Sequence, residues 1–99
     1  MPITSKPGSD SNEVVVVVAG RFDFSTHQEF VKAYKENPKG SKRFVVDLKA
    51  AEYMDSSAMG MLLQLREYSR QQDVTLINGN EGIREILRIA NFDKLFAIR

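Results

Sequence analysis

An acid followed by two hydroxyls stands in the middle of the chain, at Asp55, Ser56 and Ser57. These residues follow a strand-like segment, residues 44–48, and its short connection, and they directly precede an apolar helix. A helix start leaves backbone N–H groups unpaired, and the side chain of one Asp or Ser commonly satisfies them. Because a cap needs only one residue, an accessible hydroxyl remains here that could accept a phosphoryl group.

A phosphoryl group on Ser56 would experience two opposing effects. It would meet the positive end of the helix dipole, which is worth roughly 0.3–1 kcal/mol at an exposed site. It would also lie beside the carboxylate of Asp55, which repels it. This combination suits a surface switch better than a structural anchor, and Ser57 is then predicted to be a cap or a minor site.

The segments on either side of this motif predict alternating strands and helices. Residues 1–12 indicate a short edge strand, at 3–4, and a turn at 8–12. The uniformly apolar, β-branched block 14–18 predicts a central strand that is buried on both faces. A helix begins near Thr26, with His27, Phe30, Val31 and Tyr34 along one line, and it ends at 37–40.

The second half of the chain repeats this alternation. A helix is predicted over about 56–72, with an apolar arc so wide that part of it stays exposed, and a strand over 74–77. A third helix carries Ile83, Ile86, Leu87 and Ala90 at helical spacing, and a strand over 95–98 closes the chain. The pattern predicts one α/β domain over 1–99, a mostly parallel sheet of about four or five strands with three main helices packed on it.

Composition argues against several kinds of binding partner. Fourteen basic and thirteen acidic residues among 99 give a net charge of +1, so no strong field favours nucleic acid or an anionic membrane. The chain has no cysteine, and its longest apolar run, residues 14–19, is too short to span a bilayer. We therefore expect a cytoplasmic protein that binds neither nucleic acid nor membrane.

The sequence also argues against catalysis and against a resident cofactor. The single histidine, His27, has no second histidine or cysteine with which to form a metal site. The glycines of a nucleophile elbow are absent around Ser56, and the glycines at 79 and 82 are not followed by the Lys-Ser/Thr of a phosphate-binding loop. A receiver domain would need an acidic pair after its first strand, where Ala19 and Gly20 stand instead. We expect no catalytic residue, no metal and no cofactor.

The central segment resembles the core motif of the STAS family, the anti-sigma factor antagonists. In that motif a strand ending in Asp-Leu leads through an apolar pair to Asp-Ser-Ser/Thr-Gly-Leu-Gly. This chain has Asp47-Leu48, then Tyr53-Met54, then Asp55-Ser56-Ser57-Ala58-Met59-Gly60. The resemblance covers about residues 13–99, since Gly20-Arg21-Phe22-Asp23 stands where family members usually have Gly-Glu-Leu-Asp.

The resemblance implies a regulator that works by partner switching and is not itself an enzyme. The unphosphorylated protein would bind an anti-sigma factor, usually a serine kinase of the histidine-kinase-like ATPase fold, and so free a sigma factor. Phosphorylation of Ser56 by that kinase would break the complex, and a PP2C-type phosphatase would restore it. The residues implied in partner binding are Asp23, Phe24, Asp55, Ser56, Ser57, Met59 and Gly60.

Some of these assignments compete with local structural roles. Asp23 could equally cap the helix that begins near Thr26, whereas Asp47 is predicted to form local hydrogen bonds rather than contact a partner. Tyr53 and Met54 are expected to pack into the core at least in part.

The chain departs from the family motif at two places. Ala58 replaces the family's glycine, and because alanine is the best helix former, the helix start should survive. Arg21 and Phe22 replace the family's Glu-Leu, which changes the charge beside the partner surface. The alternative is a STAS module that senses a small ligand or nucleotide, which would need a groove and a basic residue near Ser56. Arg21 is the obvious candidate for that residue.

Overall fold

The computed structural model describes residues 2–70 and 73–99. Its strands form one sheet in the order β1-β2-β3-β4-β5, in which only the β1–β2 pair is antiparallel. The strands are β1 (Ile3–Pro7), β2 (Glu13–Phe22), β3 (Arg43–Met54), β4 (Val74–Ile77) and β5 (Ala97–Ile98). The helices are α1 (His27–Lys35), α2 (Ser56–Ser69) and α3 (Glu81–Ile89), with the 3-10 turns η1 (Phe24–Thr26) and η2 (Phe92–Lys94). The predicted fold class, a mostly parallel α/β sheet with three helices, is confirmed.

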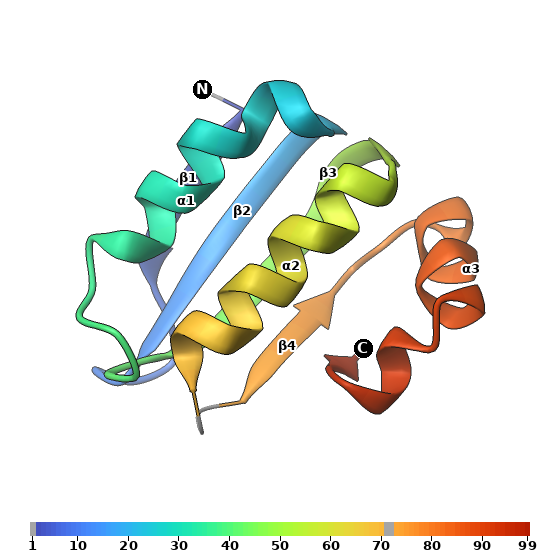
Figure 1. Cartoon of the computed structure of the whole chain (residues 1–99). Coiled ribbons are helices and arrows are strands. Elements are labelled where there is room, and N and C mark those ends of the chain that lie inside the picture. Colours follow the sequence, from blue (N-terminus) through green and yellow to red (C-terminus); the bar gives the residue numbers. More distant parts are fainter. Residues whose placement is uncertain (1, 71–72) are drawn as a thin grey trace.

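The helices gather on one side of the sheet because of the connectivity. From β2 to β5 each strand is placed next to the one before it, and the strand order never reverses. Crossovers between parallel strands are almost always right-handed, so successive crossovers in one direction place their helices on the same face. Figure 1 shows α1 and α2 lying side by side across that face, with α3 farther out on the β4 side. The helices of the described ranges are too short or too polar to cross a membrane.

This one-sided layering corrects the prediction for β2. Val16 and Val18 are fully buried beneath the helices, but Val15 and Val17 point to the opposite face and are only half-buried. The strand is central, as predicted, since it pairs with β1 and β3. The prediction of burial on both faces is wrong, because a run of valines hides the alternation that a polar outer face would reveal.

Strand β3 is much longer than the predicted 44–48 segment and leaves no separate connection before the motif. It runs on to Met54, and irregular pairing with β2 between Val17 and Ala19, and again at Gly20, accommodates the extra length. Met54 is buried at its end, whereas Tyr53 is 41% exposed. Asp55 therefore follows directly from a strand held by the sheet.

The remaining element bounds differ modestly from the predictions. Strand β1 extends to Pro7 beyond the predicted pair, and β4 matches its predicted range. The closing strand is shorter than predicted, because η2 takes up 92–94 and β5 begins only at Ala97. The predicted end of the second helix at Gln72 lies outside the described residues.

A chain of aromatic rings fixes α1 against the sheet. Phe22, at the end of β2, packs against Phe30 with 5.1 Å between ring centroids, and Phe30 meets Tyr34 edge-on at 5.7 Å. Tyr34 in turn contacts Phe44 of β3 at 6.2 Å. All four residues are buried. Each fully buried phenylalanine contributes about 1.5–3 kcal/mol, so this cluster holds the loop after Phe22 in place.

Candidate functional site

The carboxyl ends of β2 and β3 lie side by side, and the candidate residues follow both strands. Phe22 is paired with Met54 in the register of the two strands, so the loop beginning at Asp23 and the start of α2 at Ser56 emerge next to each other. The sheet thus brings together the two segments that the sequence assigned to partner binding. Their role in binding stays a prediction.

Asp55 is the N-cap of α2. Its Oδ1 accepts a hydrogen bond from the backbone N–H of Ala58 at 3.1 Å and another from the hydroxyl of Ser57 at 2.6 Å. The carboxylate thereby satisfies one of the N–H groups that a helix start leaves unpaired. It also fixes the orientation of the Ser57 hydroxyl, which is half-buried.

Ser56 differs from Ser57 in its exposure and in the hydrogen bonding of its hydroxyl. It is the first residue of α2, it is exposed, and its hydroxyl makes no hydrogen bond to any residue that the structure describes. An incoming phosphoryl donor would therefore meet a hydroxyl without breaking an internal contact. The positive end of α2 would favour the resulting phosphate, and the neighbouring carboxylate of Asp55 would oppose it.

Asp23 occupies the equivalent place after β2 and caps η1. Its carboxylate accepts hydrogen bonds from the Ser25 hydroxyl and from the Ser25 N–H at 3.0 Å, and it lies 3.2 Å from Nε of Arg21. The bond from the Ser25 hydroxyl is the main reason that the pKa of the Asp23 carboxyl lies below its usual value; the N–H of Ser25 and the Arg21 guanidinium lower it further. The predicted capping role is confirmed, although the cap serves η1 rather than α1 itself.

Two exposed aromatic contacts at this edge were not predicted. The Arg21 guanidinium lies over the ring of Tyr53 at 4.2 Å from its centroid, a cation–π contact. Phe24, 72% exposed, stacks on His27 at 5.6 Å between centroids. The strand register explains the first contact, because Arg21 and Tyr53 are cross-strand partners, and that register could not be deduced from the sequence.

Met59 and Gly60 continue the site along α2. Met59 is half-buried against the core, and Gly60 is exposed with nothing within 4 Å of the place where a side chain would begin. A glycine inside a helix costs about 1 kcal/mol relative to alanine. No contact within the described chain offsets that cost at Gly60, so the bare backbone there is open to an approaching molecule.

Asp47 lies apart from this group. Its Oδ1 accepts hydrogen bonds from the backbone N–H of Lys49 at 3.0 Å and from the side-chain amide of Asn78 at 3.1 Å. The prediction of a local hydrogen-bonding role is confirmed. The acidic residue of the Asp-Leu pair thus links β3 to the loop that follows β4.

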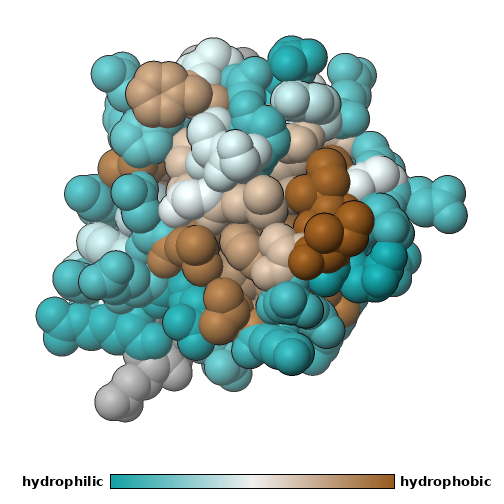
Figure 2. Space-filling view, turned by 45° about the vertical axis from the view of Figure 1, so that its right-hand side comes forward, coloured by the Kyte–Doolittle hydropathy of each residue, from teal (hydrophilic) through white to brown (hydrophobic). Residues whose placement is uncertain are grey.

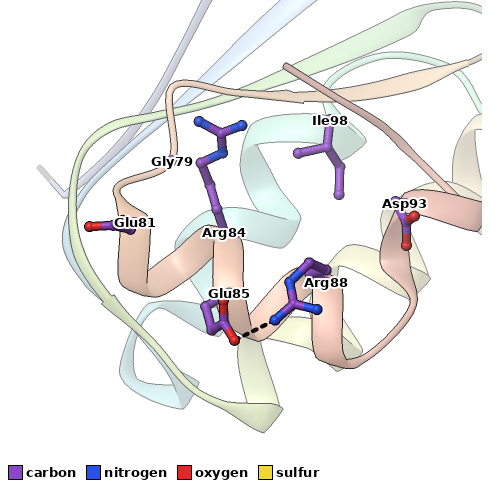
Figure 3. Close-up of a pocket in the computed structure, with 7 residues that line it drawn as sticks. All are labelled: Gly79, Glu81, Arg84, Glu85, Arg88, Asp93 and Ile98. Carbon is purple, nitrogen blue, oxygen red and sulfur yellow. Dashed lines mark hydrogen bonds and ion pairs between the residues drawn. The ribbon is translucent and has the colours of Figure 1, made fainter.

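The cavities of the described residues offer little to a nucleotide at the Ser56 helix. The small cavity that Tyr53 and Met54 help to line has a volume of about 130 Å³ and no basic residue in its lining. A larger cavity, about 550 Å³, lies against α3 instead, where Figure 3 shows Arg84 and Arg88 among Glu81, Glu85 and Asp93. Glu85 is paired with Arg88, and acids outnumber bases in this lining.

The sheet topology also argues against a ligand site at this edge. In open α/β sheets the ligand crevice forms where the strand order reverses, and the order from β2 to β5 has no reversal. Arg21, the basic residue that the ligand-binding alternative requires, is engaged with Asp23 and Tyr53. These observations weigh against that alternative.

The structure refines the expectation for Ala58. Its methyl group is fully buried, and its N–H is held by Asp55, so the backbone at this position is already helical. We expect Ala58→Gly to lower the free energy of unfolding by about 1–2 kcal/mol, from about 1 kcal/mol of helix propensity and about 0.8 kcal/mol for the buried methyl. Urea denaturation monitored by circular dichroism measures this change. A more stable variant would mean that the helix begins in a conformation that only glycine favours.

Comparison with known proteins places this geometry in a family. The family model described as "Mlab, STAS domain" matches residues 5–98. The chain is 44% identical to the STAS-domain containing protein PA14_20770 of Pseudomonas aeruginosa (strain UCBPP-PA14) over 100 residues, 99% of each chain.

Several solved structures with the same fold are named as anti-sigma factor antagonists. A putative one from Thermotoga maritima superposes with a TM-score of 0.81 at 18% identity, covering 97% of this chain and 84% of the other. SpoIIAA in its unphosphorylated form gives a TM-score of 0.71 at 14% identity, covering 98% and 86%. The model match and the close relative show that the chain belongs to the STAS domain family.

Proposed function

We propose that this protein is an anti-sigma factor antagonist that works by partner switching, with Ser56 as its phosphoacceptor. The observation that carries the proposal is the contrast between the two serines: the Ser57 hydroxyl is bound to Asp55, whereas the Ser56 hydroxyl is exposed and makes no hydrogen bond to the described residues. The fold neighbours add support, because they include SpoIIAA in an unphosphorylated and, from Bacillus, a phosphorylated form.

The proposed switch acts through charge and desolvation. The unphosphorylated protein binds an anti-sigma factor across the Asp23 loop and the start of α2. A phosphoserine at position 56 carries about −1.5 to −2 charges at pH 7 and would be buried in that contact beside Asp55. Removing such a charge from water without a partner is strongly unfavourable, so the complex dissociates. The helix itself need not change, because phosphate is compatible with a helix N-terminus.

The proposal extends to the protein's surroundings. The anti-sigma factor is a serine kinase of the histidine-kinase-like ATPase fold, and a PP2C-type phosphatase removes the phosphoryl group. We propose further that residues 1–99 act as one domain in the cytoplasm, without enzymatic activity and without contact to nucleic acid or membrane.

Phosphorylation by the cognate kinase is expected at Ser56 alone. Incubation with purified kinase and ATP should add about 80 Da, one phosphoryl group, to the wild type and to Ser57→Ala, and nothing to Ser56→Ala. Intact-mass measurement followed by peptide mapping makes the assignment. A modification mapped to Ser57, or an unmodified wild type with a kinase that phosphorylates itself or another substrate, would refute the proposed site.

A further inference from the structure

An apolar surface lies on α2, α3 and the segment after η2, and of its residues the sequence assigned only Met59 to binding. Leu63 is 41% exposed, Ile89 68% and Leu95 39%. Met59 and Ile86 are half-buried and pack against the core. We call these five residues the α2–α3 apolar face: Met59, Leu63, Ile86, Ile89 and Leu95. Figure 2 shows hydrophobic side chains gathered on this side of the molecule.

Helical spacing and one hydrogen bond relate the residues of this face to one another. Met59 and Leu63 are four residues apart on α2, and Ile86 and Ile89 are three apart on α3, so each pair shares one helix face. Nε of Arg66, one turn beyond Leu63, donates to the backbone oxygen of Leu95 at 3.0 Å. This bond places Leu95 beside the part of α2 that carries Leu63.

The core of the protein does not require the exposed members of this face. Ile83 and Leu87 already anchor α3 and are buried, whereas Ile89 leaves two thirds of its surface in water. Isoleucine is also a poorer helix former than Lys or Glu at an exposed position. Single exposed apolar residues are ordinary, but a contiguous group of them marks an interaction site.

The size of the face indicates what can cover it. The exposed parts of the five side chains amount to a few hundred Å², the scale of a functional surface patch. A stable homodimer needs about 800 Å² from each subunit, so this face alone is too small for permanent self-association. An amphipathic helix fits better, since such helices bind along apolar strips through residues at i, i+3, i+4 and i+7.

The charges beside the face indicate which side chains the bound helix carries. Arg66 and Lys94 flank Leu95, and neither is paired with an acidic side chain in residues 2–70 and 73–99. Acidic side chains on the incoming helix would complement them. The face also adjoins the proposed switch, because Ser56 lies one turn before Met59 on α2.

We propose that the α2–α3 apolar face binds an amphipathic helix of the anti-sigma factor, with acidic side chains of that helix toward Arg66 and Lys94. This inference rests on the proposed function, because it supplies a second part of the same interface. It names the segment of the partner that Leu63, Ile89 and Leu95 recognise, whereas the Ser56 region controls whether binding occurs.

The test uses calorimetry with the full chain and the purified anti-sigma factor from the source organism. Leu63→Glu and Ile89→Glu should each weaken binding at least tenfold. Leu63→Met, which keeps the apolar contact, and Lys32→Gln, which makes the same change in net charge on α1, should stay within about twofold of the wild type. Circular dichroism must show all variants to be folded. Synthetic 20-residue peptides, one for each amphipathic helix of the anti-sigma factor, then identify the occupant.

Each outcome decides a different point. If the anti-sigma factor binds the wild type and responds to Ser56→Asp but ignores Leu63→Glu and Ile89→Glu, the inference fails and the proposed function stands. If it does not bind the wild type, the proposed function itself fails. If both substitutions weaken binding but no helix peptide binds, the helical occupant is wrong. Sedimentation showing a wild-type dimer that Ile89→Glu makes monomeric would assign the face to a second copy.

Discussion

Ser56→Asp is expected to bind the anti-sigma factor at least tenfold more weakly than the wild type, a loss of roughly 1.4 kcal/mol, whereas Ser56→Ala keeps wild-type affinity and no longer responds to the kinase. An aspartate supplies one negative charge, less than a phosphate, yet an unpaired charge in a desolvated contact already costs several kcal/mol. Because Ser56 is exposed and its hydroxyl has no hydrogen bond to the described residues, Ser56→Ala removes no internal interaction.

The fold should tolerate both substitutions. A carboxylate at the first position of α2 interacts favourably with the helix dipole, by about 0.3–1 kcal/mol, which offsets its repulsion by Asp55. Circular dichroism must show all three proteins equally folded, so that a binding loss in Ser56→Asp is separated from unfolding. Calorimetry on the wild type and both variants measures the affinities, with Lys32→Gln as the control for net charge. Equal affinities for Ser56→Asp and Ser56→Ala would place the start of α2 outside the contact surface and would shift attention to the Arg21–Asp23 loop.

Leu62→Ala is expected to destabilise the protein far more than Leu63→Ala, although the two residues are adjacent and identical. Leu62 is fully buried between α2 and the sheet, whereas Leu63 belongs to the α2–α3 apolar face. Removing a buried leucine side chain costs about 2–5 kcal/mol through lost transfer free energy and the cavity left behind. The exposed change should stay within about 1 kcal/mol, because alanine's higher helix propensity offsets part of the lost contact.

Urea denaturation measures both changes in the free energy of unfolding. The dependence of that free energy on urea concentration should be the same in all variants, which checks that unfolding remains two-state. The two variants also separate stability from binding, because Leu63→Ala should remain folded but bind the proposed partner helix more weakly. Losses of similar size in the two variants would show that α2 is rotated about its axis relative to this structure. The apolar face would then be part of the core.

The order of elements and the start of α2 could be predicted from the sequence because both rest on local chemistry. Periodic apolar residues identify helices, β-branched runs identify strands, and an Asp before a helix identifies a cap. These signals located β4 without error and placed the cap in the Asp55–Ser57 segment. They also singled out Ser56 as the candidate hydroxyl, although they could not show that Ser57 is the one tied to Asp55.

The tertiary structure decided the properties that depend on contacts between residues distant in the sequence. The Val14–Val18 block could not reveal that the sheet is covered on one face only, because that follows from the direction of every crossover. The contact between Arg21 and Tyr53 depends on the irregular register of β2 and β3. The sequence predicted that part of the apolar arc of α2 stays exposed, but only the packing of the segment after η2 against α2 places Leu95 beside Leu63. Local propensity depends on residues that are neighbours in the sequence, whereas a binding surface forms only when separate elements pack together.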